Sequence, residues 1–266
     1  MVEPRRKALR LEQQLDALAA RPFAHRGLHT PGGPVENSIA AFDAAIAKGL
    51  GIELDIRLTS DGTAVVFHDE ELDRLTGESG RVAERSARAL SQIKLTGTDD
   101  GIMALQDVLL HIGGRVPLLI EAKCSKGQPP EAVAMAVRRA MEGYVGPLGV
   151  MSFHPGIPAW YASHFPGILN GLVMTEESGK DIASWRTSGP ARLLTMKRSG
   201  AKFLAYDIRS FPSKLVEHFR TPKTRVFTWT VRTADEVATA RAHTDQMIVE
   251  GDAVELCQQE DNGPTI

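Results

Sequence analysis

Acidic side chains and a histidine stand in a stretch of sequence that is otherwise typical of buried strands. Residues 50–72 read LGIELDIRLTSDGTAVVFHDEEL, in which Glu53 and Asp55 are two residues apart and His68 ends the second apolar run. An unpaired carboxylate is costly to bury in a protein core. We therefore expect Glu53, Asp55 and His68 to serve a binding or catalytic site.

Further ionisable residues stand at or near the ends of other apolar runs. His25 and Arg26 follow the run that begins at Pro22, and Glu121 and Lys123 end the run VPLLIEAK. Three carboxylates gathered at one place repel one another unless a cation is bound. Because oxygen-only ligation favours a hard ion over zinc, the acids predict a site for Mg²⁺ or Ca²⁺.

The histidines and cations of this set indicate the class of reaction. Two histidines can act as general acid and general base near neutral pH. Arg26 and Lys123 supply positive charge for an anionic oxygen, and the arginine fork matches the geometry of a phosphate group. A metal ion, paired histidines and fixed cations together are typical of phosphoester cleavage.

The elements that must position these residues alternate along the chain. Short apolar runs predict strands, and helical periodicity lies between most of them. The predicted strands are 22–25, 52–58, 64–68, 116–123, 148–153, 168–174, 202–207, 225–231 and 246–250, and the predicted helices are 38–49, 104–113, 130–142, 191–200, 212–221 and 234–243. This alternation predicts a parallel sheet with helices outside it.

One connection is too short for a parallel crossover, because only TSDGT, residues 59–63, separates two predicted strands. We predict an antiparallel hairpin with Asp61 and Gly62 as a two-residue turn. Nine strands less this return strand leave eight, the number in a (β/α)8 TIM barrel. The turn would place Asp55 opposite His68, with Glu53 on the same side. This inference depends on the register, since a one-residue change would move His68 to the other face.

We divide the chain into an N-terminal helix and one barrel domain. Residues 1–21 predict an amphipathic helix, with Leu11, Leu15 and Leu18 on one face, that packs across a barrel end. A membrane-surface or partner helix is the alternative, which the narrow apolar face disfavours. Residues 22–266 predict a single TIM-barrel domain, and the polar segment at about 71–101 predicts an insertion over the barrel mouth.

Composition excludes several classes of protein. The 266 residues carry a net charge of −2, which gives no reason to expect a nucleic-acid partner. No apolar run reaches the roughly 20 residues of a membrane span, so no stable membrane insertion is expected. Cys124 and Cys257 have no C-x-x-C spacing, and the N-terminus lacks a secretory signal, so we expect a cytoplasmic protein. No oligomeric state is predicted.

Seven short motifs together resemble the glycerophosphodiester phosphodiesterase family. They are AHRG (24–27), ENS (36–38), ELD (53–55), HD (68–69), EAK (121–123), SFHP (152–155) and WTV (229–231). The likeness extends over about residues 23–254. It implies a TIM-barrel enzyme that uses a divalent cation, Mg²⁺ or Ca²⁺, to hydrolyse glycerophosphodiesters to glycerol phosphate and an alcohol.

The resemblance also implies a role for each matching residue. By position in the motifs, Glu53, Asp55 and Glu121 resemble metal ligands, His25 and His68 resemble the acid–base pair, Arg26 and Lys123 resemble phosphate ligands, and Trp229, with Phe153 beside it, resembles an aromatic wall for glycerol. The neighbouring Asn37 and Ser38 are predicted to cap the helix that begins at Ile39, with a pocket contact as the second role of Asn37.

Some positions depart from the family pattern. Val35 separates Pro34 from Glu36, Arg232 replaces the usual Asn, and Glu250 stands where Thr-Asp is usual. Glu250 either favours a cationic or hydrogen-bonding head group or pairs with Arg232, and we prefer the pairing.

Two alternative functions remain open at this point. One is phospholipase D-like cleavage of lysophospholipids or sphingolipids, which an exposed apolar patch at the mouth would favour. The other is a sensor that binds a phosphodiester without turnover, which the complete acid–base pair disfavours.

Overall fold

A closed parallel barrel forms the body of the molecule. The computed structural model describes residues 2–177 and 188–259. Its strands are β1 (Phe23–Ala24), β2 (Gly51–Leu58), β3 (Ala64–Val66), β4 (Leu118–Ala122), β5 (Leu148–Ser152), β6 (Leu169–Met174), β7 (Phe203–Asp207), β8 (Arg225–Val231) and β9 (Gln246–Val249). They pair in the order β1-β9-β8-β7-β6-β5-β4-β2-β3, and a further β1–β2 pairing closes the ring. Only β3 joins antiparallel, to β2, so the predicted (β/α)8 TIM barrel is confirmed.

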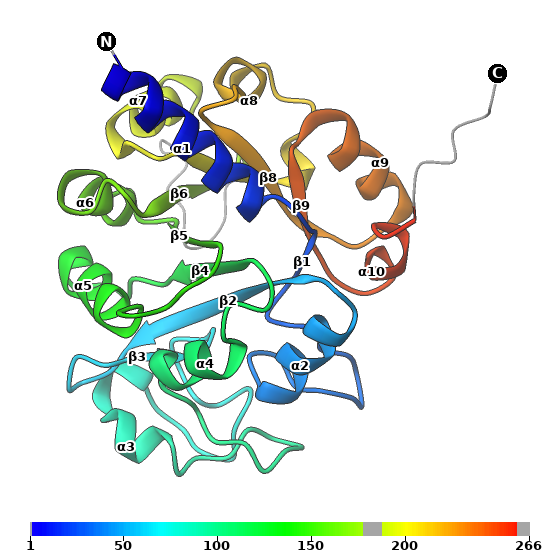
Figure 1. Cartoon of the computed structure of the whole chain (residues 1–266). Helices are drawn as coiled ribbons and strands as arrows, with labels where there is room; N and C mark the ends of the chain where they lie inside the picture. Colours follow the sequence, from blue (N-terminus) through cyan, green and yellow to red (C-terminus); the bar gives the residue numbers. More distant parts are fainter. Residues whose placement is uncertain (1, 178–187, 260–266) are drawn as a thin grey trace.

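Helices surround the barrel (Figure 1). They are α1 (Val2–Leu18), α2 (Ile39–Ala47), α3 (Ala87–Leu90), α4 (Leu105–Ile112), α5 (Pro130–Ala140), α6 (Gly156–His164), α7 (Gly189–Ser199), α8 (Lys214–Phe219), α9 (Ala234–His243) and α10 (Ala253–Leu256), with the 3₁₀ turns η1 (Val82–Glu84) and η3 (Ile208–Ser210). Among these helices, none has the length and apolar content that crossing a membrane requires.

Local sequence signals explain where several helices begin and end. The Ser38 side chain accepts a hydrogen bond from Ala41 N at 3.2 Å and caps α2. Thr233 and Glu236 form a capping box at the start of α9. Helix α6 was not predicted, because glycine and proline within its first turn weaken the helical pattern. Pro158 is tolerated there, since the N–H groups of a first turn have no partner within the helix.

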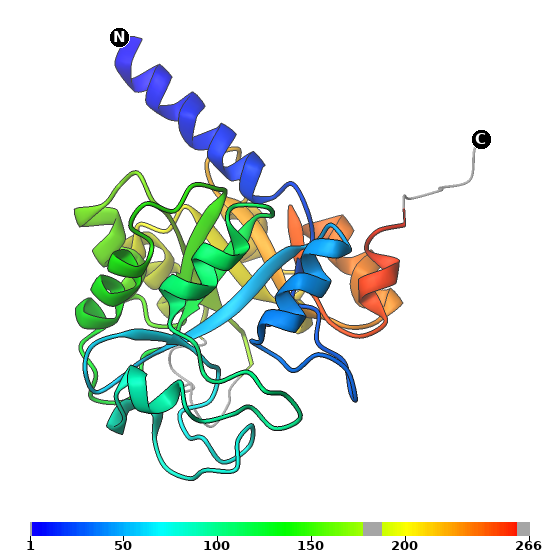
Figure 2. The ribbon, with the colours of Figure 1, turned by 60° about the horizontal axis from the view of Figure 1, so that its bottom comes forward.

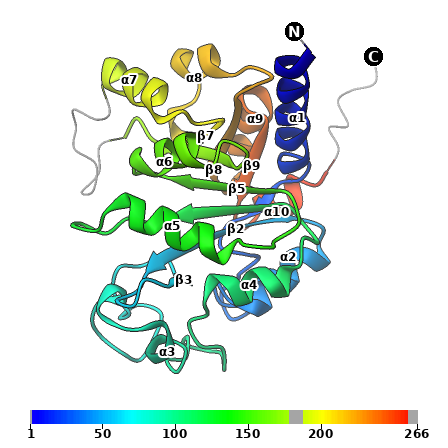
Figure 3. The same ribbon diagram turned by 60° about the vertical axis from the view of Figure 1, so that its left-hand side comes forward.

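Helix α1 closes the end of the barrel that lies opposite the carboxyl ends of the strands (Figures 2 and 3). Leu15 and Leu18 are fully buried among residues of the barrel interior, including Phe203 and Phe227. Gly171 leaves room for the Phe203 ring, because a Cβ atom there would come within 2.1 Å of it. The apolar face of α1 therefore packs on its own barrel.

The hairpin exists, but its predicted register is wrong by one residue. Arg57 pairs with Val65, and Phe67 N donates to Asp55 O at 3.0 Å, so Asp55 faces Phe67 rather than His68. The loop has three residues, 60–62, and closes with a 3.0 Å bond from Thr59 N to Thr63 O. Gly62 has a φ of +75°, which suits the left-handed position that ends such a loop.

The insertion at 71–101 contains no barrel strand, as expected. Its apolar residues, including Leu72, Leu90 and Leu95, form a small core together with Val65 and Phe67 of the hairpin. Figure 3 shows it at the end of the barrel to which the strand arrows point. Within the described chain, none of its residues lines the cavity described below.

Candidate active site

A cavity of about 410 Å³ opens at the carboxyl ends of the strands. Its lining residues are His25, Arg26, His68, Glu121, Lys123, Phe153, Asp207, Ile208, Arg209, Trp229, Thr230, Arg232 and Glu236. Seven of the nine predicted site residues are in this set. The other two, Glu53 and Asp55, are each 1% exposed. Glu53 is bound to the lining residue Arg26, and Asp55 is bound to the lining residue Lys123. A second cavity of about 470 Å³ lies against α1, where Arg10 is the one charged lining residue in the described chain.

Three buried carboxylates form a cluster beside the cavity. Glu53, Asp55 and Glu121 each offer an oxygen, and these atoms all lie within 4.8 Å of one another. Burial, and then repulsion from Asp55 and Glu121, raises the pKa of Glu53 well above its usual value. Burying all three carboxylates in ionised form without a cation would therefore be unfavourable.

Two cations offset part of that charge. Lys123 Nζ lies 3.0 Å from Asp55 Oδ1 and 2.5 Å from Glu121 Oε1, and Arg26 Nε lies 3.3 Å from Asp55 Oδ2. Burial alone would raise the pKa of Asp55, but Lys123, followed by the nearby histidine and arginine side chains, lowers it well below its usual value. When all three carboxylates are ionised, they carry one charge more than the two cations, which fits a divalent ion with oxygen ligands.

The loops after β1 and before α2 hold the acids in place. Arg26 N donates to Glu53 Oε2 at 3.0 Å. Asn37 Nδ2 donates to Asp55 Oδ2 at 3.1 Å, and Asn37 Oδ1 accepts from Asp55 N at 3.2 Å. The predicted capping role belongs to Ser38 alone, and Asn37 orients a member of the carboxylate cluster.

His68 is bonded to the residue that follows it. Its Nδ1 lies 2.6 Å from Asp69 Oδ1, and Arg74 Nε lies 2.5 Å from Asp69 Oδ2. Arg74 also donates to both oxygens of Glu36, at 2.7 and 2.9 Å, and Glu36 accepts from Arg26 NH1 at 2.8 Å. One residue of the insertion thus connects His68 with the loops around the cluster.

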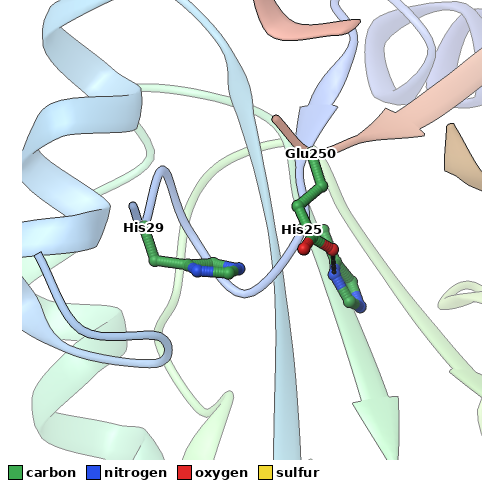
Figure 4. Close-up of side chains that lie close together, drawn as sticks. All are labelled: His25, His29 and Glu250. Carbon is green, nitrogen blue, oxygen red and sulfur yellow. Dashed lines mark hydrogen bonds and ion pairs between the residues drawn. The ribbon is translucent and has the colours of Figure 1, made fainter. Parts of the chain in front are cut away.

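His25 has an equivalent partner on another strand end. Its Nδ1 lies 2.9 Å from Glu250 Oε2 (Figure 4). Arg232 NH2 donates to the same oxygen at 3.0 Å. The hydrogen bond with His25 lowers the pKa of Glu250 to about 2, although burial acts the other way. The predicted pairing of Glu250 with Arg232 is confirmed.

These partners determine which nitrogen of each ring is available for chemistry. The pKa of Asp69 is lowered despite burial, by its bonds from Arg74 and His68, so Asp69 and Glu250 are both ionised near neutral pH. An ionised carboxylate can only accept hydrogen bonds. Nδ1 of each histidine therefore carries a proton, and Nε2 is the nitrogen that can gain or lose one.

Aromatic and charged residues line the outer part of the cavity. The rings of Phe153 and Trp229 meet edge to face, with centroids 5.4 Å apart. Trp229 Nε1 donates to Ala205 O at 3.0 Å, which fixes the indole. Arg209, paired with Asp207 at 2.5 Å, and Arg232 make the rest of this rim polar.

Sequence reasoning missed Glu36 and Arg74, and it gave Asn37 a pocket contact only as a second role. Asn37 carried a detectable signal. A helix has one N-cap residue, and because Ser38 takes that position, the adjacent Asn37 is free to bond elsewhere. Glu36 stands in the ENS motif but was given no role, and Arg74 carried no signal, because its bond joins the irregular insertion to a loop 38 residues away.

Comparison with known proteins agrees with this architecture. A glycerophosphodiester phosphodiesterase from Bacillus altitudinis is 44% identical over 71 residues, which are 26% of this chain and 28% of that protein. The segments matched in the curated relatives cover between 24% and 44% of the lengths of those proteins.

Solved structures share the fold over most of the chain. A glycerophosphodiester phosphodiesterase from Thermotoga maritima superposes with a TM-score of 0.68 at 25% identity, over 88% of this chain and 95% of that one. An Oleispira antarctica phosphodiesterase, solved in complex with the product sn-glycerol-3-phosphate, gives a TM-score of 0.72 at 21% identity, over 88% and 94%.

The matching family model is described as the glycerophosphoryl diester phosphodiesterase family, and it covers residues 25–250. That range contains every strand of the barrel except β1 and every residue of the cavity wall. The chain belongs to the glycerophosphoryl diester phosphodiesterase family.

Proposed function

We propose that this protein hydrolyses glycerophosphodiesters to glycerol 3-phosphate and an alcohol. The observation that carries the proposal is one cavity that combines two histidines, each bound through Nδ1 to an ionised carboxylate, with two cations and an acidic cluster. Membership of the family supports it, as does the product bound to the Oleispira antarctica relative.

In this proposal Glu53, Asp55 and Glu121 would hold a divalent cation, either Mg²⁺ or Ca²⁺. When bound, such an ion supplies positive charge that polarises the phosphoryl group and stabilises the transition state. Asn37 orients Asp55 for this role, and the backbone N–H of Arg26 orients Glu53.

The remaining residues bind the substrate and move protons. Arg26 and Lys123 are the cations that meet the phosphate oxygens, and Phe153 with Trp229 forms an apolar wall against the glycerol carbons. One histidine Nε2 accepts the proton of the attacking group, either water or the glycerol 2-hydroxyl, and the other donates a proton to the leaving alkoxide. Attack by the 2-hydroxyl gives a cyclic phosphate, which water then opens to glycerol phosphate. Glu250 and Asp69 keep the two rings oriented for this exchange.

The rim of the cavity favours a water-soluble substrate over a lysolipid. Arg209, Arg232 and Glu236 surround the outer cavity, and Phe153, 38% exposed, is the one exposed large apolar residue of its lining in the described chain. A sensor without turnover would need no acid–base pair. A cytoplasmic location stays a prediction.

The test is an assay of purified protein with glycerophosphocholine, glycerophosphoethanolamine, glycerophosphoglycerol and a lysophosphatidylcholine. Glycerol 3-phosphate is measured by a coupled enzyme assay, with Mg²⁺, with Ca²⁺ and with chelator. We expect cation-dependent release from the soluble diesters. Turnover of the lysolipid alone would support the phospholipase D-like alternative, and binding of the diesters without turnover would support the sensor.

A further inference from the structure

A second group of metal-binding side chains lies beside the proposed acid–base site. His25, His29 and Glu250 each offer one ligand atom, and these atoms all lie within 4.8 Å of one another. In Figure 4 the His29 ring extends from the loop after β1 toward His25 and the carboxylate of Glu250. The group shares no residue with the three buried carboxylates, and its donors are two imidazoles and one carboxylate.

The atoms of this group have unused capacity for a ligand. His29 Nε2 is buried and has no hydrogen-bond partner among the described residues. Both bonds recorded to Glu250, from His25 and Arg232, go to Oε2, so within the described chain Oε1 accepts no protein hydrogen bond. Buried polar atoms are normally satisfied, so a buried imidazole nitrogen aimed at a histidine and a carboxylate needs an explanation.

We infer that His25, His29 and Glu250 form a second metal site, one that takes a borderline transition ion such as Zn²⁺ and that inhibits the enzyme when filled. Two imidazoles and a carboxylate are a donor set typical of Zn²⁺ and its neighbours in the first transition row, whereas Mg²⁺ and Ca²⁺ prefer oxygen alone. The two sites thus differ in the class of ion that they select.

The geometry needs only a small adjustment. Two ligand atoms of a tetrahedral zinc ion lie about 3.3 Å apart, given zinc–ligand distances of about 2.0–2.1 Å. His25 Nδ1 and Glu250 Oε2 are already 2.9 Å apart. The widest separation in the group is at most 4.8 Å, so closing it to about 3.3 Å requires a movement of roughly 1.5 Å. Rotation of the His29 side chain on its loop can supply this.

Inhibition follows from the tautomer of His25. The nitrogen that faces Glu250 is Nδ1, which carries the ring proton in the metal-free form. An ion that binds Nδ1 must displace this proton. The ring stays neutral when the proton moves to Nε2. Nε2 then has no lone pair with which to accept a proton, and as a donor this neutral ring is a weaker acid than the imidazolium that it replaces. This inhibitory consequence rests on the proposed function, whereas binding of the ion does not.

Binding is tested by calorimetric titration of the full chain with Zn²⁺ in a large excess of Mg²⁺, which keeps the carboxylate cluster filled. The wild type is compared with His29→Gln and with His111→Gln, a matched control whose exposed imidazole binds Asp43 of α2. Circular dichroism checks that each variant is folded, and His29→Asn replaces His29→Gln if the latter is not. We expect one ion per wild-type chain and an affinity at least about tenfold weaker in His29→Gln only.

A second readout identifies the ligands. Co²⁺ bound through imidazole nitrogen at low coordination number gives strong visible bands, whereas octahedral Co²⁺ with oxygen ligands absorbs weakly. Strong bands that His29→Gln removes and His111→Gln leaves would support the site. Equal Zn²⁺ affinity in wild type and His29→Gln, or no Zn²⁺ bound in excess Mg²⁺, would overturn it.

Inhibition by Zn²⁺ is measured separately, as Mg²⁺-dependent turnover at rising Zn²⁺ concentration. We expect the half-inhibitory concentration to rise at least about tenfold in His29→Gln, with turnover unchanged when Zn²⁺ is absent. Tight binding without inhibition would overturn the inhibitory role. If no variant turns over any diester, the proposed function fails, and calorimetry still decides whether the site exists.

Discussion

Each histidine of the cavity is held by a carboxylate, and each of those carboxylates is bound by an arginine. Glu250 with Arg232 serves His25, and Asp69 with Arg74 serves His68. The two arrangements come from different parts of the chain, yet each leaves Nε2 as the nitrogen that exchanges a proton. This equivalence fits the proposal that one ring acts as the acid and the other as the base.

The histidines are therefore expected to contribute to turnover far more than other histidines do. Replacing His25 or His68 by Ala should lower kcat by roughly 10²–10⁴-fold, because each would remove an acid–base group. His111→Ala, which alters an exposed ion pair with Asp43, is the control and should leave kcat unchanged. Steady-state kinetics measures all three variants, and near wild-type kcat in either cavity variant would exclude that residue as an acid–base catalyst.

Asn37 tests whether residues behind the carboxylates tune ion binding. Its φ is +57°, so Asn37→Gly keeps the backbone conformation while removing the amide that bonds Asp55. The concentration of Mg²⁺ or Ca²⁺ that gives half-maximal activity should rise about 10–100-fold. An unchanged cation requirement, in a variant with an unchanged melting temperature, would show that Asn37 has no such role.

At the scale of elements, the two ends of the barrel have separate tasks. The carboxyl ends of the strands carry the cavity, and α1 closes the opposite end with Leu15 and Leu18. The hairpin and its insertion supply His68 and Arg74 to the cavity side. Changes at α1 should therefore affect folding rather than chemistry.

Leu15→Ala is the corresponding stability prediction. Leu15 is fully buried, so its truncation should lower the free energy of unfolding by about 2–5 kcal/mol. Leu110→Ala truncates a leucine that is 74% exposed and should change the free energy of unfolding by less than about 0.5 kcal/mol. Urea unfolding measures both, and kcat of the folded Leu15→Ala protein should match wild type. Equal stability of the two variants would contradict the packing described for α1.

At the scale of the whole molecule, the barrel was predictable from sequence because its strands are buried on both faces. Runs such as LLIEA in β4 and LGVMS in β5 are mostly apolar, and the eight-strand count followed from one connection being too short for a crossover. The register of the hairpin was not predictable in the same way. Asp61-Gly62 suits a two-residue turn and also a three-residue loop that ends at Gly62, and only packing of the strands chooses between them.

The candidate site was likewise predictable in part. Residues in short motifs at strand ends could be assembled from sequence, since parallel strands end at one face of a barrel. Bonds between distant loop residues could not, as the contacts of Glu36 with Arg74 and of His25 with Glu250 illustrate. Such contacts depend on side-chain positions that no local pattern encodes.

The measurement that tests the central claim most directly is ³¹P NMR of glycerophosphocholine incubated with the protein and Mg²⁺ or Ca²⁺. It follows which phosphoester bond breaks. We expect the diester resonance to be replaced by that of glycerol 3-phosphate, and chelator to prevent the change. Formation of phosphocholine would mean cleavage on the other side of the phosphorus. An unchanged diester resonance with either ion would contradict hydrolysis of this substrate class.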